Sequence, residues 1–162
     1  HILSPFGIRP TLDLLASGAL QQLKTLSFSL RPAQLDLLGL VPAVQSAMQR
    51  IAEPAGLRCE LSTRGEEPGK LEENAAVAVR LVQEALTNTV RHADAERVRV
   101  RLRFLPGGRI SVLMLDDGIG FDKAAVLNGR QSERNIGLYG MIERTELAGG
   151  RLHIRTWGGD RK

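Results

Sequence analysis

Residues 70–93 read KLEENAAVAVRLVQEALTNTVRHA, and residues 97–104 read RVRVRLRF. The first stretch contains neither glycine nor proline and predicts one long helix. The second alternates arginine with apolar residues, the period of a strand with one face in solvent and the other in a core. A long helix followed closely by such a strand favours an α+β domain in which helices cover one face of a sheet.

Apolar spacing and turn residues place the other elements around this pair. Steps of three or four predict helices, alternation predicts strands, and proline or glycine marks where they stop. The other expected elements are a helix over 39–53, a strand over 57–61, a polar turn over 63–69, a strand over 109–115 joined to 97–104 by Pro106-Gly107-Gly108, a loop over 116–135, a helix over 138–148 and a last strand over 151–156. Together they predict a two-layer α/β sandwich with a mixed sheet and helices on one face.

An amphipathic helix is expected before this sandwich. Between Thr11 and Leu30, leucine and alanine recur at helical spacing and form a single apolar stripe. Such a stripe needs a partner, and a helical hairpin or a dimeric bundle would supply one. We therefore expect two domains, a bundle helix with its linker over residues 1–32 and the sandwich over residues 33–162.

Composition excludes several classes of protein. Of the 162 residues, 43% are hydrophobic and 25% are charged, which is near the globular average and unlike disordered chains. No apolar run approaches the roughly 18 residues that cross a bilayer. The single cysteine, Cys59, excludes an internal disulfide and fits a reducing compartment. The first residues lack the basic flank and apolar core of a signal peptide, so we expect a cytoplasmic location.

The net charge of +4 is weak evidence for a nucleic-acid partner. Four arginines occupy alternate positions of one expected strand and therefore share a face: Arg97, Arg99, Arg101 and Arg103. We interpret this face as the solvated side of the sheet. An acidic protein surface is the next alternative and nucleic acid the last.

The first candidate site lies on the long helix. Four polar side chains follow each other at steps of three or four residues and should share a face: Glu84, Asn88, Arg91 and His92. The apolar residues expected on the opposite face are Leu71, Ala78, Val82 and Ala85. A carboxylate and a carboxamide one turn apart can share a hard cation such as Mg²⁺ and its water, and a carboxylate can also take a proton. The simpler alternative is a solvated helix face.

The second candidate site is the stretch DDGIGFD at residues 116–122, directly after an apolar strand. A carboxylate at a strand end, followed by alternating glycines, lets the backbone pass close to a flat ligand. The carboxylate could then accept a hydrogen bond from an exocyclic amine. An ordinary acidic turn is the alternative.

The third candidate site is NIGLYGM at residues 135–141, a glycine-rich entry into the expected helix. Free N–H groups and the positive end of the helix dipole favour phosphate at such a place. Lys123, Arg130 and Arg134 precede it and could close over a polyphosphate. A close-packed helix start and a basic loop without a ligand are the alternatives.

In this order, the three motifs resemble the ATP-binding domain of the GHKL superfamily, which joins gyrase, MutL-type repair proteins, heat-shock chaperone ATPases and histidine kinases. The closest resemblance within it is to the nitrate-sensor and DesK-like class of sensor histidine kinases. Four stretches carry it, namely the junction at 30–40, the N box at 83–93, the D box at 116–121, and the glycine box at 137–144 with Gly149-Gly150. The resemblance runs from about Leu12 to Thr156.

The resemblance implies a Bergerat fold, preceded by a helix of a dimerisation bundle. It implies binding of Mg-ATP and transfer of the γ-phosphate to a histidine on the bundle, for relay to an aspartate of a response regulator. Nothing in residues 1–32 matches the phosphoaccepting histidine, so this segment is expected to be the second bundle helix only. The expected partners are ATP, the histidine-bearing bundle of the full-length protein, a response regulator and a second copy in a homodimer.

Carried over to this sequence, the resemblance assigns roles to the polar motifs. Asn88 would bind Mg²⁺, and Glu84 would orient or deprotonate the attacking group and reach the metal through water. Arg91 and His92 would line the phosphate or ribose side. Asp116 would accept a hydrogen bond from the adenine amino group.

The remaining assignments concern glycine-rich backbone. Gly118 and Gly120 would leave room for the adenine ring, and the phosphates would lie at the helix start formed by Gly137, Leu138 and Gly140. The family usually ends with one further strand, so the last strand is expected to be truncated here. Ile142 stands where an arginine is usual.

Two other classes of function stay open. One is a GHKL ATPase that works as a conformational switch, or a serine kinase of the anti-sigma type, against which the bundle-like helix and its junction argue. The other is a degenerate module that binds partners without nucleotide, against which Glu84, Asn88 and Asp116 argue.

Overall fold

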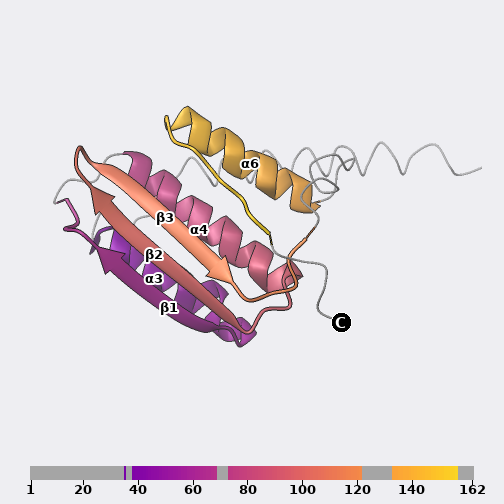
Figure 1. Cartoon of the computed structure of the whole chain (residues 1–162). Coiled ribbons are helices and arrows are strands. Elements are labelled where there is room, and N and C mark those ends of the chain that lie inside the picture. Colours follow the sequence, from indigo (N-terminus) through magenta and orange to yellow (C-terminus); the bar gives the residue numbers. More distant parts are fainter. Residues whose placement is uncertain (1–34, 36–37, 69–72, 122–132, 157–162) are drawn as a thin grey trace, which may run out of the picture. The chain divides into compact units, whose positions relative to one another are not determined.

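The computed structural model describes residues 35, 38–68, 73–121 and 133–156, all within the unit Pro32–Lys162 (Figure 1). The helix expected over residues 11–30, and with it the domain expected over 1–32, lie outside the described residues. The described elements are α3 (Leu40–Ile51), the short 3₁₀ helix η1 (Glu53–Ala55), β1 (Arg58–Arg64), α4 (Glu73–His92), β2 (Arg97–Leu105), β3 (Arg109–Asp116) and α6 (Glu133–Leu147).

The three strands form one mixed sheet in the order β1-β2-β3. Strand β1 pairs with β2 in parallel, from Arg58 opposite Arg97 to Arg64 opposite Arg103. Strand β3 returns antiparallel to β2 after the Pro106-Gly107-Gly108 turn, as expected for a hairpin. The turn expected from Thr63 was placed two residues too early, because Thr63 and Arg64 still pair with β2.

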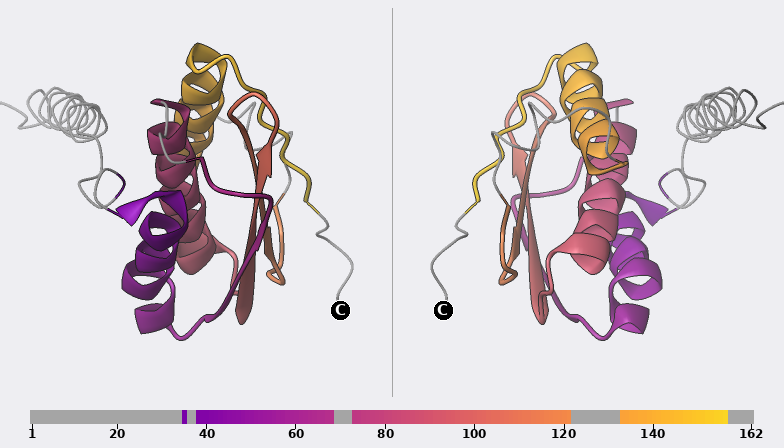
Figure 2. Two further views of the ribbon diagram at one scale, coloured as in Figure 1. Left: turned by 90° about the vertical axis from the view of Figure 1, so that its left-hand side faces the viewer. Right: turned by 90° about the vertical axis from the view of Figure 1, so that its right-hand side faces the viewer.

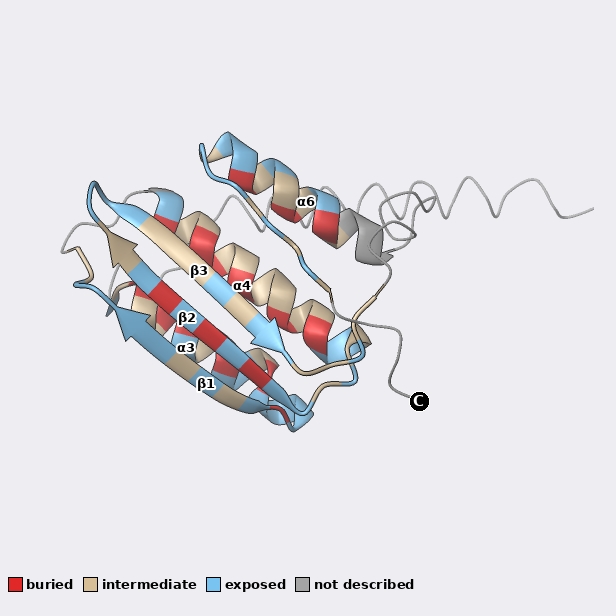
Figure 3. Cartoon of the chain, viewed as in Figure 1, coloured by how far each residue is buried: buried red, intermediate tan, exposed pale blue. Residues whose placement is uncertain are grey.

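The described α-helices, α3, α4 and α6, lie on one side of the sheet (Figure 2). Burial alternates along β2 (Figure 3), where Val98, Val100 and Leu102 are at most 1% exposed and the intervening arginines are exposed. The buried side chains pack against α3 and α4, whose core residues include Val44 and Leu86. The α+β sandwich with helices on one face is therefore confirmed, and the four arginines of β2 are exposed on the other face, as expected.

The N-terminus of α3 is capped by a residue from another part of the chain. The backbone N–H groups of Leu40 and Val41 donate hydrogen bonds to the carboxylate of Glu67. Gly39 precedes the helix with φ of 93°, and a side chain there would collide with Glu67. A carboxylate at this end of a helix satisfies otherwise unpaired donors and interacts favourably with the helix dipole.

Two expectations for the C-terminal part were wrong. Residues 151–156 form no strand, and the described sheet ends at β3. The hydroxyl of Thr156 instead bonds the backbone N–H and carbonyl of Phe121, each at 2.9 Å. Helix α6 begins at Glu133, five residues before the expected start at Leu138, because residues 133–136 contain no helix breaker and the helix runs on through Gly137.

Candidate functional site

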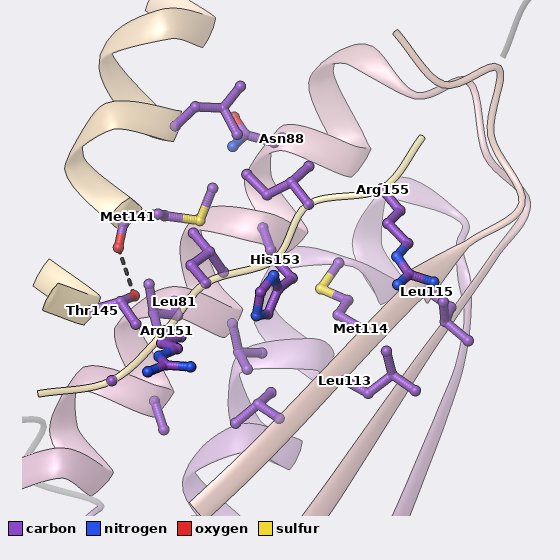
Figure 4. Close-up of a pocket in the computed structure, with 18 of the residues that line it drawn as sticks. Leu81, Asn88, Leu113, Met114, Leu115, Met141, Thr145, Arg151, His153 and Arg155 are labelled. Atoms are coloured by element: carbon purple, nitrogen blue, oxygen red, sulfur yellow. Dashed lines mark hydrogen bonds between the residues drawn. The ribbon is translucent and has the colours of Figure 1, made fainter. Parts of the chain in front are cut away.

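A cavity of about 640 Å³ opens between α4, β3, α6 and residues 150–156. Figure 4 shows Asn88 and Leu81 reaching it from α4, Met141 and Thr145 from α6, and Met114 from β3. The residues expected to bind ATP that line it are Asn88, His92, Asp116, Gly118, Gly120 and Leu138. The chain thus brings parts of all three sequence motifs to one place.

The sequence predicted that the polar and apolar residues of α4 lie on opposite faces, but in the structure the two groups adjoin. Ala85, placed on the buried side by the sequence argument, lines the same cavity as Asn88 and His92. A helix turns by about 100° per residue, so positions 85, 88 and 92 lie within one narrow sector. The cavity therefore has an apolar wall from α4 with polar groups along one border, which suits a flat ligand with a polar edge.

Glu84 and Arg91 do not line this cavity. Glu84 lies against Gly137 of α6, where an added Cβ would collide with its carboxylate, and the same Cβ would lie 3.6 Å from the Asn88 carboxamide nitrogen. Arg91 is exposed at the last turn of α4. Glu84 and Asn88 are thus brought together at the α4–α6 contact, while Arg91 is turned away from the cavity.

Two partly buried arginines lie near Glu84. Arg144 of α6 packs its guanidinium against Gly140, 3.0 Å from where a Cβ would stand. Burial lowers the pKa of Arg144, whereas the negative charges of Glu84 and Glu143 raise it. Burial and the positive charge of Arg144 lower the pKa of Arg80 on α4. The carboxylate of Glu84 is therefore close to positive charge, an arrangement that favours further anionic groups beside it.

The glycine motif does not form a helix start. Gly137 and Gly140 lie inside α6 and do not line the cavity, so their N–H groups are not the free donors that the sequence argument expected. Their lack of side chains instead admits Glu84 and Arg144. Leu138, between them, is 5% exposed and faces the cavity.

Asp116 ends β3 at the border of the cavity. Its Oδ1 accepts a hydrogen bond from Gly118 N at 3.0 Å, and its Oδ2 accepts one from the Thr89 hydroxyl at 3.4 Å. Thr89 is 6% exposed and was missed by the sequence analysis. A polar residue next to Asn88, within the apolar sector of α4, was the available signal. These two donors orient the carboxylate and leave acceptor positions for a ligand.

Gly118 is required by the close approach of two backbone segments. A Cβ there would collide with the Ala93 carbonyl and lie 2.7 Å from the Ala93 Cβ. The next residue, Ile119, donates its N–H to that same carbonyl at 2.8 Å. Gly120 has φ of 68°, which non-glycine residues rarely adopt. The two glycines thus hold the turn after β3 against the end of α4.

Asp117 was not singled out by the sequence analysis, yet it fixes the strand end that carries Asp116. Its Oδ1 accepts from the N–H groups of Glu96 and Arg97 at 2.9 and 2.8 Å, and its Oδ2 accepts from Arg97 Nε at 3.0 Å. The hydrogen bonds from Arg97 lower its pKa from 3.8 to about 2. Sequence spacing could not reveal this contact, because the partners start another strand.

The low pKa of Asp117 predicts an acid-dependent contribution to stability. The Asp117 carboxylate takes up a proton less readily in the folded state than in the unfolded chain, so its ionised form stabilises the fold. This stabilisation is fully present above the unfolded pKa of 3.8 and is lost as the pH falls towards the folded pKa of about 2. We expect the urea midpoint of Asp117→Asn to lie below that of the parent at neutral pH and to meet it near pH 2. Urea titrations across this range measure the difference. The control is Asp94→Asn, at an exposed position. A difference in urea midpoint between Asp117→Asn and the parent that persists at pH 2 would contradict this role of Asp117.

The donor set near Glu84 fits a magnesium ion only in combination with a ligand. The described residues contain no group of three or more His, Cys, Asp or Glu side chains that could hold a metal. The Glu84 carboxylate and the Asn88 carboxamide nevertheless both lie beside Gly137, and the carboxamide carries an oxygen that could bind the metal. Mg²⁺ commonly takes one or two protein oxygens and completes its shell with phosphates and water.

Comparison with known proteins identifies this arrangement. A family model described as "Histidine kinase-, DNA gyrase B-, and HSP90-like ATPase" matches residues 73–161, which include α4, β2, β3 and α6. The chain belongs to this family. Its fold is therefore that of the GHKL ATPases, and ATP is the ligand that the family implies.

Named relatives of this GHKL domain are sensor kinases. An "Uncharacterized sensor-like histidine kinase" of Chloroflexus aurantiacus is 34% identical over 146 residues, which cover 88% of this chain and 24% of that protein. "Sensor histidine kinase MctS" of Rhizobium johnstonii is 34% identical over 141 residues, which cover 86% of this chain and 30% of that protein. The chain thus spans less than a third of these relatives.

Solved structures share the fold. The histidine kinase domain of the blue-light activated histidine kinase from Erythrobacter litoralis matches with a TM-score of 0.53 and 21% identity, covering 74% of this chain and 56% of that one. A longer chain of the same kinase matches with a TM-score of 0.58 and 21% identity, and the match covers 98% of this chain and 49% of that one. Among the described residues of this GHKL domain, no helix is long and apolar enough to span a membrane.

Proposed function

We propose that this GHKL domain is the catalytic, ATP-binding part of a sensor histidine kinase. It binds Mg-ATP and transfers the γ-phosphate to a histidine on a bundle helix, from which a response regulator takes it. The observation that carries the proposal is the meeting of the N-box and D-box residues at one cavity, with Asn88, His92 and Asp116 on its wall. The names of the curated relatives support the kinase assignment.

The adenine end of the nucleotide lies at Asp116 in this proposal. Thr89 and Gly118 already donate to this carboxylate, so its remaining lone pairs can accept from the exocyclic amino group of adenine. The apolar surfaces of Ala85, Met114 and Leu138 line the same cavity and suit the faces of the ring.

The phosphate end lies toward the α4–α6 contact. Asn88 and Glu84 supply the oxygen donors that fit Mg²⁺, which would neutralise phosphate charge when bound. The partly buried Arg144 packs its guanidinium against Gly140 and supplies positive charge there. Glu84 orients or deprotonates the attacking imidazole, so its effect falls on the transfer step.

Replacing Asp116 with asparagine tests the adenine site. Gly118 N would hold the carboxamide oxygen, which leaves the amide NH₂ facing the adenine amine, donor against donor, whereas the Thr89 hydroxyl can turn and accept from it. We expect ATP affinity to fall by about tenfold to a hundredfold, the usual cost of a hydrogen-bonding group left unmatched once the ligand covers it. Isothermal titration with Mg-ATP measures it, and the exposed Asp94→Asn is the matched control. Unchanged affinity in Asp116→Asn would refute the adenine assignment.

A transfer assay separates this function from its alternatives. Incubating the chain with radiolabelled ATP and a bundle fragment that carries a histidine should give acid-labile phosphoprotein. Acid-stable phosphoserine would identify a serine kinase of the anti-sigma type, and ATP hydrolysis without a phosphoprotein would identify an ATPase switch. The absence of any nucleotide binding would identify a degenerate module.

A further inference from the structure

The outer face of the sheet, away from the helices, carries an uneven distribution of charge. Seven exposed charged residues of β1 and β2 lie on it: Arg58, Glu60, Arg64, Arg97, Arg99, Arg101 and Arg103. At the end near Asp117 the arginines are paired, Arg99 with Glu60 at 2.9 Å and Arg97 with Asp117 at 3.0 Å. That half of the face is close to neutral.

The other half of the face is positive. Arg64, Arg101 and Arg103, here called the distal arginine cluster, form no ion pair with another residue of the described chain. Arg64 stands directly opposite Arg103 in the parallel ladder, about 4.8 Å away across neighbouring strands. Like charges directly opposite each other destabilise a sheet. An anionic ligand that neutralises them would relieve this repulsion, which adds to its binding free energy.

Exposed apolar side chains border the cluster. Leu113 of β3 is opposite Arg101 and 43% exposed, and Leu115 is opposite Arg99 and 39% exposed. A surface of arginine beside exposed leucine has the composition of a protein-binding site, in which arginine supplies bidentate contacts to carboxylates and the apolar groups supply buried area. Phosphate backbones gain nothing from the leucines.

We propose that the distal arginine cluster, with Leu113, is a docking site for an acidic segment of another protein. Glu60 and Asp117 on the other half of the face disfavour a nucleic-acid duplex or an anionic membrane, because either would extend over them. A second copy docking face to face is disfavoured, since a symmetric contact sets arginine against arginine. The arginines lie apart from the adenine end of the cavity, because Asp116 pairs with Val98 at the opposite end of β2 from Arg103, whereas Leu113 also lines the cavity.

Binding of a defined probe tests the site in the whole chain. The probe is a fluorescent peptide of glutamate and aspartate with two leucines, and its matched control has glutamine and asparagine in place of the acids. We expect the acidic peptide to bind, the amide peptide not to bind, and Arg101→Glu/Arg103→Glu to weaken binding by about tenfold or more. Arg50→Glu reverses an exposed charge on α3 and should change affinity less than about twofold. Circular dichroism reports whether each variant is folded, and Mg-ATP binding gives a second check for the arginine variants.

Further variants and probes decide between kinds of partner. Arg101→Gln/Arg103→Gln avoids introducing negative charge into the sheet and should weaken the acidic peptide severalfold. Leu113→Ser should weaken the peptide but not a short DNA duplex. The proposal is overturned if Arg101→Glu/Arg103→Glu binds the peptide like the parent. It is also overturned if the duplex, or phosphatidylserine vesicles, compete as well as the peptide does, because either result shows a general anion surface.

Discussion

Glu84→Gln should reduce the rate of phosphoryl transfer by about a hundredfold to ten-thousandfold, the range for loss of a general base. Glutamine has the same shape and can keep the contact with Gly137, but it cannot accept a proton from the attacking imidazole. Because the interaction belongs to the transition state, ATP affinity should stay within about threefold of the parent. Single-turnover transfer to a histidine-bearing bundle fragment, alongside Mg-ATP titration, separates these two quantities.

The control for this variant is Glu143→Gln. Glu143 is an exposed glutamate of α6 that also raises the pKa of Arg144 through its charge, so its replacement removes a similar electrostatic interaction without touching Gly137. We expect its transfer rate to be near that of the parent. Equal slowing in both variants would mean that Glu84 acts only through Arg144, and an unchanged rate in Glu84→Gln would remove it from the catalytic residues.

Gly118→Ala should destabilise the domain and impair ATP binding together. The added methyl group meets the Ala93 carbonyl and Cβ, two groups at the end of α4 that cannot rotate away. We expect a loss of roughly 3 kcal/mol, the upper part of the range for overpacking. At this chain length that loss corresponds to a melting temperature about 10 °C lower. The shifted turn would also move Asp116, which bonds Gly118 N, so ATP affinity should fall.

Gly56→Ala is the matched control for adding a methyl group to glycine. A Cβ at Gly56 would meet no atom within 4 Å. Because φ is 82° there, the loss of stability should be only the roughly 1 kcal/mol that a non-glycine residue costs in the left-handed conformation. Differential scanning fluorimetry with and without Mg-ATP measures both variants. If Gly118→Ala melts like Gly56→Ala and keeps its nucleotide-induced shift, the close approach to Ala93 does not constrain the site.

Much of the fold could be predicted because the spacing of apolar and polar residues along a helix or strand is a property of neighbouring residues. The alternation of Arg97 to Phe104 determined which face of β2 is buried, and the burial of Val98 and Val100 follows it. The absence of glycine and proline between Lys70 and Ala93 determined a long α4. These features depend on side-chain period and backbone freedom, which are properties of neighbouring residues.

The elements that were wrong depend on partners elsewhere in the chain. Whether residues 151–156 pair as a strand depends on a neighbouring sheet edge, and here Thr156 bonds Phe121 instead. Gly137 and Gly140 lie inside α6 because glycine in a helix costs only about 1 kcal/mol, which the packing of Glu84 against Gly137 can outweigh. Local sequence around Gly137 therefore could not indicate that it lies inside a helix against Glu84.

For the candidate site, residue types and spacing were enough to indicate which groups carry the chemistry: the carboxylate and carboxamide of α4, the acidic end of β3, and the glycines. Their arrangement in space depends on the folded chain. It put Asn88 and His92 on the cavity, turned Arg91 away, and gave Asp116 the donors Thr89 and Gly118. The reason is that residue type is a local property, whereas hydrogen-bond geometry and burial depend on segments far apart in the chain, such as Asp117 and the start of β2.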